Sequence, residues 1–571
     1  MNSRKELDIG NSDFKNVIEN NHYFVDKSLF IREVLKAEKA VLLLPRPRRF
    51  GKTLNLSMLR YFFDIKETES EKLFTTLKIW ESEEEIKNKR GKYPVIYISF
   101  KDAKKETWQK TLQYIAAEIS KLYKQHIFLL NENILHDFEI VKFQNILYEK
   151  SDEVALENSL YQLTEYLYRF YKQRVVVLID EYDTPIQAAY NKFYNEAISF
   201  VRSLLSTVLK DNSYLYKGVI TGILRISKES IFSGLNNVSV YSIFDEKFAD
   251  KFGFTESEVK QLLTDFEVTT DYAEIKKWYN GYKIGELTNV YNPWSILNFA
   301  VNFKNGFKTY WVNTSSDEIL KEQLNKRDAD YTRQQLLQLI NNETIEKTIN
   351  ENFVYPELDS DHELLWTLLT FSGYLTYVNK CSTDSYSLKI PNYEIKFVFT
   401  NIILKWLSVD LKLRKTLLEE TTKYLITNQI EKFEIGFKEI IGDTFSYFDT
   451  NGTPEKIYQS YVLGLLAIIG DDYIIKSNRE SGDGRYDIML IPHNKTKYGV
   501  VIEIKQIQKK ENETQTLLLQ RIEKKITEAK TQIEKNNYFM ELKDHKIENI
   551  IKLPIVFVGK EPYIIPKKSK K

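Results

Sequence analysis

The stretch LLLPRPRRFGKTLNL, from Leu42 to Leu56, constrains the fold of this chain more than any other feature. An apolar run leads into a Pro/Gly turn, after which Gly51-Lys52-Thr53 opens an amphipathic helix. This order predicts a phosphate-binding loop, in which backbone N–H groups and the positive end of the helix dipole surround an anion. Lys52 would bridge the β- and γ-phosphates of a nucleotide, and the Thr53 hydroxyl would ligate Mg²⁺.

The match to this loop is imperfect, because the pattern G-x-x-x-x-G-K-[ST] has glycine where Arg46 stands. A second segment supports the assignment of a phosphate-binding loop. The β-branched run Val175–Ile179 ends in Asp180-Glu181, as expected for a buried parallel strand that delivers two carboxylates at its carboxyl end. Asp180 would hold Mg²⁺ through water, and Glu181 would polarise the attacking water in NTP hydrolysis. The alternative is that Asp180 only caps a helix after a core strand.

Apolar runs and helical stretches alternate over the first half of the chain, which predicts a parallel sheet wound with helices. The fourth run ends at Thr221, beside the expected Asp180 strand, where it could sense the γ-phosphate; Arg225 could approach the same phosphate. A turn residue and a surface cation are the alternatives for these two side chains. The runs are Val41–Leu44, Val95–Ser99, Val175–Ile179 and Lys217–Thr221, with helices expected over Thr111–Tyr123 and Asn158–Tyr171.

Composition indicates a large globular protein. The 571 residues are 43% hydrophobic and 28% charged, which suits three or four domains with sizeable cores. The single cysteine, Cys381, excludes an intramolecular disulfide and a cysteine-based metal cluster. No apolar run indicates export or membrane spanning, so we expect a cytoplasmic protein without a membrane partner. A formal charge of +1 argues against a uniformly basic nucleic-acid-binding coat but permits local patches.

The first 320 residues resemble the AAA-ATPase-like domain of a large, mostly bacterial family, whose members commonly add a C-terminal PD-(D/E)XK nuclease fold. Arg46 is typical of the family's loop. The resemblance implies an ATPase core over residues 1–254 and a small helical lid over 255–320. It also allows a homo-oligomer. The blocks that carry it are VDKSLFIREVL, RPRRFGKTLNLSMLRYFFD, VVVLIDEYDTPI, TGILRISKESIFSGLNN, FGFTESEV, WYNGYKIG, VYNPWSILN and YWVNTSS.

The middle region, residues 321–440, reads as a helix, a β-hairpin and another helix, which is compatible with a winged-helix module. Such modules bind DNA or serve as packing adaptors. Lys389, Lys396 and Lys405 are scattered and form no stripe, which favours the adaptor. The aromatic residues of WYNGY and YNPWS in the expected lid are interpreted as core anchors with polar handles.

A second set of chemical groups lies in residues 441–571. The segment SGDGRYD leads through a strand and a turn into YGVVIEIK. Glu503 and Lys505 would project from one face of a strand, and a hairpin would bring Asp487 alongside them. Asp487, Glu503 and the Ile504 carbonyl could hold Mg²⁺ or Mn²⁺, and Lys505 could steady the attacking water or the charge that develops at phosphorus. The alternative is an ordinary hairpin with surface charges.

This D-x₁₅-E-x-K arrangement resembles the α/β core of PD-(D/E)XK nucleases, a restriction-endonuclease-like fold. The resemblance implies Glu455 as a further acidic metal ligand on a leading helix, and Gln532 and Tyr538 on a trailing helix. Gln459 stands where many relatives carry histidine, so any contribution of that imidazole is absent here.

The sequence therefore predicts an ATP-hydrolysing module that controls a metal-dependent nuclease acting on nucleic acid, with DNA favoured. One alternative is a STAND-type regulatory ATPase whose C-terminal fold binds nucleic acid or protein without cleaving it. Another is a scaffold in which both sites are degenerate.

Overall fold

The computed structural model describes residues 5–226, 237–311, 330–340, 342–361, 363–399, 415–444, 458, 462, 466, 469, 472–481, 484–510, 513–559 and 561–564. Glu455, Gln459 and Lys405 lie outside them. The chain divides into two compact units. Unit 1 comprises residues 1–312 and 344–395, and unit 2 comprises 313–343 and 396–571.

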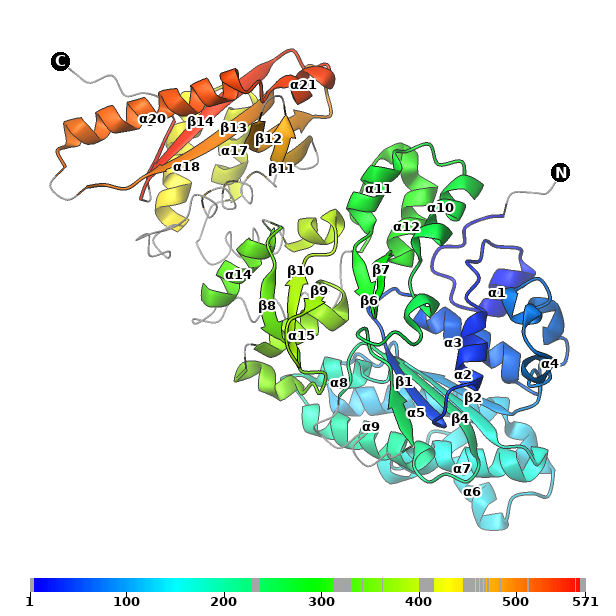
Figure 1. Cartoon of the computed structure of the whole chain (residues 1–571). Helices are drawn as coiled ribbons and strands as arrows, with labels where there is room; N and C mark the ends of the chain where they lie inside the picture. The colour runs from blue at the N-terminus through cyan, green and yellow to red at the C-terminus, as the bar shows by residue number, and fades with distance from the viewer. Residues whose placement is uncertain are drawn as a thin grey trace. The chain divides into compact units, whose positions relative to one another are not determined.

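Unit 1 is built on a five-stranded parallel sheet with the strand order β2-β3-β4-β1-β5 (Figure 1). The four expected runs form strands within one or two residues of the predicted bounds, because short β-branched and apolar runs suit a strand buried on both faces. The strands are β1 (Val41–Pro45), β2 (Val95–Ser99), β3 (Val175–Asp180), β4 (Leu215–Gly222) and β5 (Val238–Val240).

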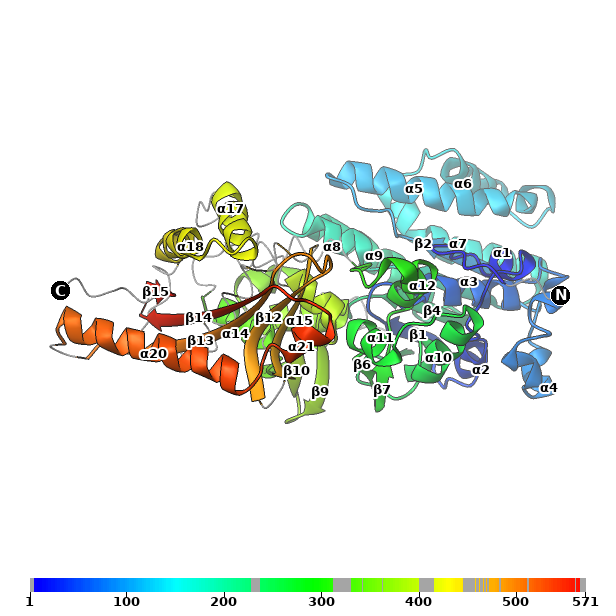
Figure 2. The same cartoon turned by 90° about the horizontal axis from the view of Figure 1, so that it is seen from above.

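Helices cover both faces of this sheet (Figure 2). Leu42 and Leu44 point to the face that carries α3, whereas Val41 points to the α9 face, where Leu209 packs against Gly218. The two expected helices are present, as α5 and α7. The helices of this part are α1 (Phe14–Glu19), α2 (Leu29–Leu35), α3 (Lys52–Phe63), α4 (Glu84–Lys87), α5 (Trp108–Gln125), α6 (Asp137–Leu147), α7 (Glu153–Tyr171), α8 (Thr184–Ala189) and α9 (Tyr194–Leu209).

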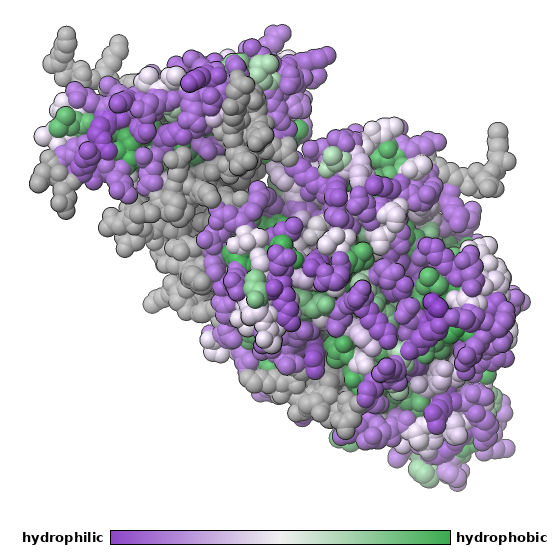
Figure 3. Space-filling model, viewed as in Figure 1, coloured by the Kyte–Doolittle hydropathy of each residue, from purple (hydrophilic) through white to green (hydrophobic). Residues whose placement is uncertain are grey.

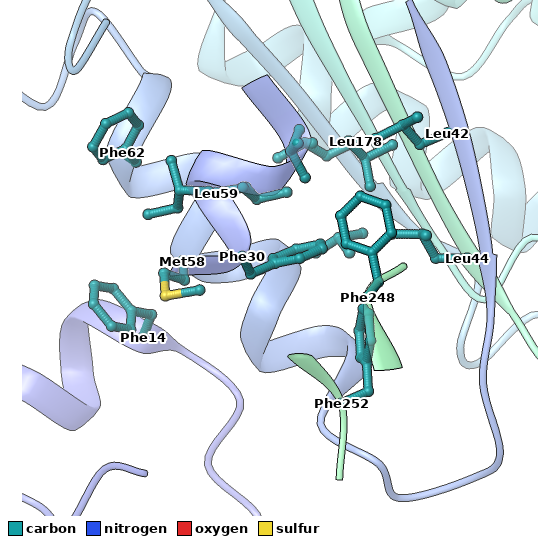
Figure 4. Packing of buried hydrophobic residues seen from close by; sticks show 14 of the residues in the cluster. Phe14, Phe30, Leu42, Leu44, Met58, Leu59, Phe62, Leu178, Phe248 and Phe252 are labelled. Carbon is teal, nitrogen blue, oxygen red and sulfur yellow. The ribbon is translucent and has the colours of Figure 1, made fainter. Parts of the chain in front are cut away.

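An aromatic-rich core lies between α3 and the sheet (Figure 4). Phe30 of α2 meets Phe248 and Phe252 edge to face, with ring centroids 5.8 and 5.2 Å apart. Leu44 at the end of β1 belongs to the same cluster. The strand that leads into the phosphate loop is thus held by a packed core.

A smaller helical layer follows the sheet, within the range 255–320 for which the sequence predicts a lid, and we call this layer the lid. Tyr279, Tyr282 and Tyr291, from the WYNGY and YNPWS blocks, are buried as expected for core anchors, whereas Trp278 and Trp294 of the same blocks are only half-buried. Tyr279 packs against Phe299 at 5.4 Å. The layer consists of α10 (Glu256–Asp265), α11 (Tyr272–Tyr279), β6 (Tyr282–Ile284), β7 (Leu287–Val290) and α12 (Pro293–Asn302).

Residues 344–395 add a three-stranded antiparallel sheet, in the order β8-β10-β9, to unit 1. The expected helix and hairpin are present, and residues 393–399 are helical. Lys396 is 9% exposed, so it lies mostly inside the fold, whereas Lys389 is exposed. The elements are β8 (Ile345–Thr348), α15 (Glu363–Ser372), β9 (Thr376–Lys380) and β10 (Ser385–Lys389).

Unit 2 contains a five-stranded mixed sheet in the sequential order β11 to β15, with α20 packed on β13 and β14. Only the pair β13 and β14 is parallel, which follows from the long helical connection between them. The elements of this unit are α14 (Asp330–Ile340), α17 (Lys415–Ile426), α18 (Ile430–Thr444), β11 (Tyr473–Ser481), β12 (Gly484–Pro492), β13 (Gly499–Ile507), α20 (Gln515–Lys535), α21 (Met540–Asp544), β14 (Ile550–Val558) and β15 (Glu561–Tyr563).

The chain has a predominantly hydrophilic surface on the face drawn in Figure 3, with hydrophobic residues scattered over it. Among the residues that the structure describes, no helix is both long and apolar enough to span a bilayer.

A buried carboxyl group joins residues 344–395 to the lid. Glu394 is 1% exposed and accepts hydrogen bonds from Tyr310 N at 2.5 Å, Trp311 N at 2.9 Å and Ser295 Oγ at 2.7 Å. Burial raises its pKa to about 7, although these three donors oppose the rise. The carboxyl group therefore becomes protonated in the folded protein at a pH where an exposed glutamate is ionised.

We expect this group to make stability depend on pH. Because its folded pKa is raised, its contribution is fully present below about pH 4.5 and is lost as pH rises towards 7. Glu394→Gln retains an acceptor for both amides and removes the titration. The unfolding free energy of the variant minus that of wild type should rise by roughly 3 kcal/mol between about pH 4.5 and 8. Urea unfolding across this range measures it, and parallel pH profiles would contradict the assignment.

Candidate nucleotide and nuclease sites

The loop between β1 and α3 has the backbone of a phosphate-binding turn. Gly51 has φ of 84° and stands at the N-terminus of α3. A Cβ at this position would meet nothing within 4 Å, so the left-handed conformation, and not crowding, requires glycine. The loop therefore ends on the positive end of the α3 dipole.

Lys52 is 5% exposed, and its Nζ donates to the carbonyls of Arg46 at 3.1 Å and Pro47 at 3.0 Å. Burial lowers the pKa of this ammonium, and the nearby carboxylates of Glu181 and Asp180 oppose the change. An ammonium buried against neutral carbonyls suits a site that receives an anion, because a phosphate would supply the charge that the carbonyls do not.

Arg46, which replaces the first glycine, points into the fold. It is fully buried, and its Nη1 donates to Tyr241 O at 2.7 Å and to Pro45 O at 2.8 Å. Its guanidinium lies 5.1 Å from the centroid of the Phe252 ring. Burial lowers its pKa to about 10, which leaves it charged at neutral pH. Arg46 therefore fastens the start of the loop to the segment that follows β5.

Asp180 is the centre of a buried hydrogen-bonded cluster. Its Oδ1 accepts from Thr221 Oγ1 at 2.7 Å, and its Oδ2 accepts from Thr53 Oγ1 at 2.8 Å and from Ser99 Oγ at 3.3 Å. Burial raises its pKa, while the hydrogen bonds from Thr221 and Thr53 oppose the rise. Asp180 ends β3 and caps no helix; Asp183 is the residue that precedes α8.

The strand order explains this cluster. Because β4 lies between β3 and β1, Thr221 comes between the Asp180 strand and the loop that carries Thr53. The Thr53 hydroxyl and the Asp180 carboxylate form an adjacent pair of oxygen donors, the ligand type that Mg²⁺ prefers. This pair fits the metal expected beside the phosphates.

Glu181 has φ of 52°, a left-handed conformation that costs about 1–3 kcal/mol in a residue other than glycine. Its Oε2 accepts from Thr184 Oγ1 at 3.2 Å. The next two residues fasten the turn to the chain after β4. Tyr182 OH donates to Leu224 O at 2.7 Å, and Asp183 Oδ2 accepts from Ile223 N at 2.8 Å.

Arg225 is not joined to the Asp180 cluster by any contact that the structure shows within the described residues. Its carbonyl accepts from Phe353 N at 3.1 Å, and its charge is among those that oppose the burial-driven rise in the pKa of Glu351. Its approach to a phosphate stays a prediction.

In unit 2 the hairpin places Asp487 on β12 beside Glu503 and Lys505 on β13. Asp487 Oδ2 accepts from Ile504 N at 2.7 Å, and Lys505 Nζ donates to Glu503 Oε1 at 2.7 Å. The Glu503 side chain is 2% exposed and the Lys505 side chain 20% exposed. Two carboxylates and one ammonium thus lie on neighbouring strands, just beyond the pair of Ile488 with Ile502.

The trailing helix α20 carries Gln532, whose Nε2 donates to the hydroxyl of buried Tyr538 at 3.1 Å. Tyr538 itself was expected on this helix but lies in the turn that follows it, because α20 ends at Lys535. Among the described residues, no group of three or more His, Cys, Asp or Glu side chains is arranged to hold a metal. Asp487 and Glu503 are the two described carboxylates that could hold a metal here. The third acid expected from sequence, Glu455, lies outside the described residues.

Two families of known proteins match this chain over separate ranges of residues. Residues 8–232 match the family described as "Predicted AAA-ATPase", and residues 453–567 match the PD-(D/E)XK nuclease superfamily. The chain pairs an AAA-ATPase-like domain with a PD-(D/E)XK nuclease domain. It is also similar to an "Uncharacterized protein in vnfD 5'region" from Azotobacter chroococcum mcd 1, at 28% identity over 414 residues, which are 70% of each chain.

Sequence reasoning missed two residues of the AAA-ATPase-like domain. Tyr182 and Asp183 follow the catalytic candidate directly, and both side chains are buried against the loop after β4. Both residues stand in the block DEYDTP, but a tyrosine that follows two acidic residues is equally compatible with an ordinary core residue. Only the fold shows which backbone groups they bind.

Proposed function

We propose that the AAA-ATPase-like domain binds and hydrolyses ATP and thereby controls the nuclease domain. The observation that carries the first part is the meeting of Lys52, Thr53, Asp180 and Thr221 at one edge of the sheet. Three segments distant in sequence place an ammonium, two hydroxyls and a carboxylate around the glycine turn. This is the set of groups that nucleotide hydrolysis requires.

In the proposed reaction, water attacks the γ-phosphorus of ATP, and the bond from this phosphorus to the β–γ bridging oxygen breaks. Glu181 accepts the proton of the water, and ADP and phosphate leave. Lys52 and the loop amides stabilise the phosphate charges, while Thr221 fixes the orientation of Asp180. Thr53 and Asp180 would hold Mg²⁺, which would neutralise part of the phosphate charge.

For the nuclease domain we propose hydrolysis of a phosphodiester bond in nucleic acid, with DNA as the substrate. Lys505 orients the attacking water and stabilises charge at phosphorus, and one P–O ester bond breaks. A divalent cation bound by Asp487 and Glu503 would supply Lewis-acid activation. Two observations favour this reaction over the alternative of an ordinary hairpin with surface charges. Asp487 accepts a hydrogen bond from the backbone of β13, and Glu503 is buried.

ATP binding should depend on Lys52. Lys52→Ala removes the buried ammonium of the loop and should weaken ATP affinity by about 100-fold or more. Glu181→Gln should bind ATP like wild type but lose about 100-fold or more in kcat, since the shape stays and the base is gone. Calorimetry and phosphate release measure the two effects, with Lys110→Ala on the exposed side of α5 as the control. Equal ATP affinity in wild type and Lys52→Ala would refute the loop assignment.

Cleavage should depend on Glu503 and Asp487. Glu503→Gln and Asp487→Asn each remove a ligand charge and should lower Mg²⁺- or Mn²⁺-dependent cleavage of plasmid DNA by about 100-fold or more, with ATP turnover retained. Glu548→Gln changes an exposed glutamate of the same unit and serves as the matched control. Unchanged cleavage in both site variants would assign the activity elsewhere. Binding without cleavage by wild type would favour the STAND-type alternative.

Nucleotide state should alter the nuclease. Glu181→Gln, saturated with ATP, and Lys52→Ala, which does not bind it, represent the two states of the AAA-ATPase-like domain. Their cleavage rates should differ by more than about threefold, because a ligand shifts an equilibrium by its difference in affinity for the two conformations. Initial rates on one plasmid across an ATP titration measure this. Indistinguishable rates would show that the domains are merely tethered.

A further inference from the structure

The phosphate loop carries three arginines that reach three different surroundings. Arg46 is buried in the core, as described above. Arg49 has φ of 65°, and its Nη1 donates to Tyr310 O at 2.6 Å while its guanidinium stacks 4.5 Å from the centroid of Trp294 in the lid. Arg48 lies between these two and donates to Gln187 on α8, the helix that follows Asp180 and Glu181.

Arg48 crosses from the loop to α8. Its Nη2 donates to Gln187 Oε1 at 2.8 Å, and Gln187 is 8% exposed. The α8 helix begins at Thr184, whose hydroxyl donates to Glu181. One hydrogen bond therefore joins the Arg48 guanidinium to α8, and a second joins the start of α8 to Glu181, the proposed base.

Electrostatics agree with this placement. Burial is the main cause of the lowered pKa of Lys52, and Arg48 is one of the charges that lower it further. The Arg48 guanidinium is thus near enough to the Lys52 ammonium to lower its pKa. Two cations on one loop that ends at a helix N-terminus suit a ligand with several negative charges.

We propose that Arg48 contacts the γ-phosphate of ATP and stabilises the transition state of hydrolysis, as an arginine supplied by the same chain. This assignment rests on the ATPase function proposed above. As water attacks phosphorus and the bond to the bridging oxygen breaks, charge spreads over the γ-phosphate oxygens, and a planar guanidinium can donate to two of them. Gln187 is a positioning residue that orients the guanidinium through its carbonyl oxygen.

A built-in arginine makes the site complete within one chain. Where the arginine comes from a neighbouring subunit, turnover per chain rises with protein concentration as subunits associate. Turnover per chain should here be constant over a wide dilution range.

The test compares Arg48→Ala and Arg48→Lys with wild type in the full-length protein, with Arg174→Ala as a control at an exposed position before β3. Both Arg48 variants should bind ATP within about threefold of wild type and lose about 100-fold or more in kcat, the range measured for arginines and oxyanion donors of this kind. Lysine should not restore the rate, because it lacks the planar fork. Circular dichroism confirms that the variants are folded.

Two further readouts separate contact with the reacting phosphate from a structural role. Added guanidinium ion should restore part of the turnover of Arg48→Ala, and the affinity for ADP with aluminium fluoride should fall much more than the affinity for ADP alone. Turnover of Arg48→Ala within about twofold of wild type would overturn this inference and leave the ATPase assignment intact. Absence of ATP binding by wild type would instead overturn the ATPase assignment itself.

Discussion

The buried carboxylate of Asp180 is the constraint on which the rest of unit 1 depends. Its two oxygens accept hydrogen bonds from β2, β4 and the start of α3. A buried carboxylate without hydrogen-bond donors destabilises the folded state, so the fold is stable only when these three donors keep their positions. The same contacts set the distance between the glycine turn and the strand that carries the acids, so the stability and the proposed chemistry of the domain share one group.

Three other buried side chains hold the segments on either side of Asp180 in place. Arg46 attaches the start of the loop to the segment after β5, and Tyr182 with Asp183 attaches the acid turn to the chain after β4. Each contact is made to backbone atoms, which hold their place irrespective of side-chain changes nearby. The loop and the acid turn are therefore fixed by separate contacts, and the hydrogen bond from Thr53 to Asp180 joins the helix after the loop to the strand before the turn. A ligand between the loop and the acid turn can alter their relation without unfolding either.

Much of the fold could be predicted from sequence, and the reasons are physical. The four strand runs are short, apolar and β-branched, and strands buried on both faces leave few other interpretations. Asp487 beside Glu503 followed from the two-residue period and one hairpin. The direction of Arg46 could not be predicted, because two of the carbonyls that accept from it, those of Tyr241 and Phe248, lie about 200 residues away in the chain. The same holds for Glu394, an ordinary helix glutamate in sequence whose burial arises only from long-range packing.

The division of the chain has a consequence for how it can be cut. The polypeptide passes between the two units three times, after residues 312, 343 and 395. Residues 344–395 are held in unit 1 by packing as well as by sequence: Phe244 stacks on Tyr386 at 4.3 Å, and Tyr282 OH donates to Gly373 O. A protease that nicks the chain once near residue 312 would leave fragments bound to each other by this interface. Gene truncation at the end of the lid, in contrast, would strip Phe244 and Tyr282 of their partners and expose apolar surface that favours aggregation.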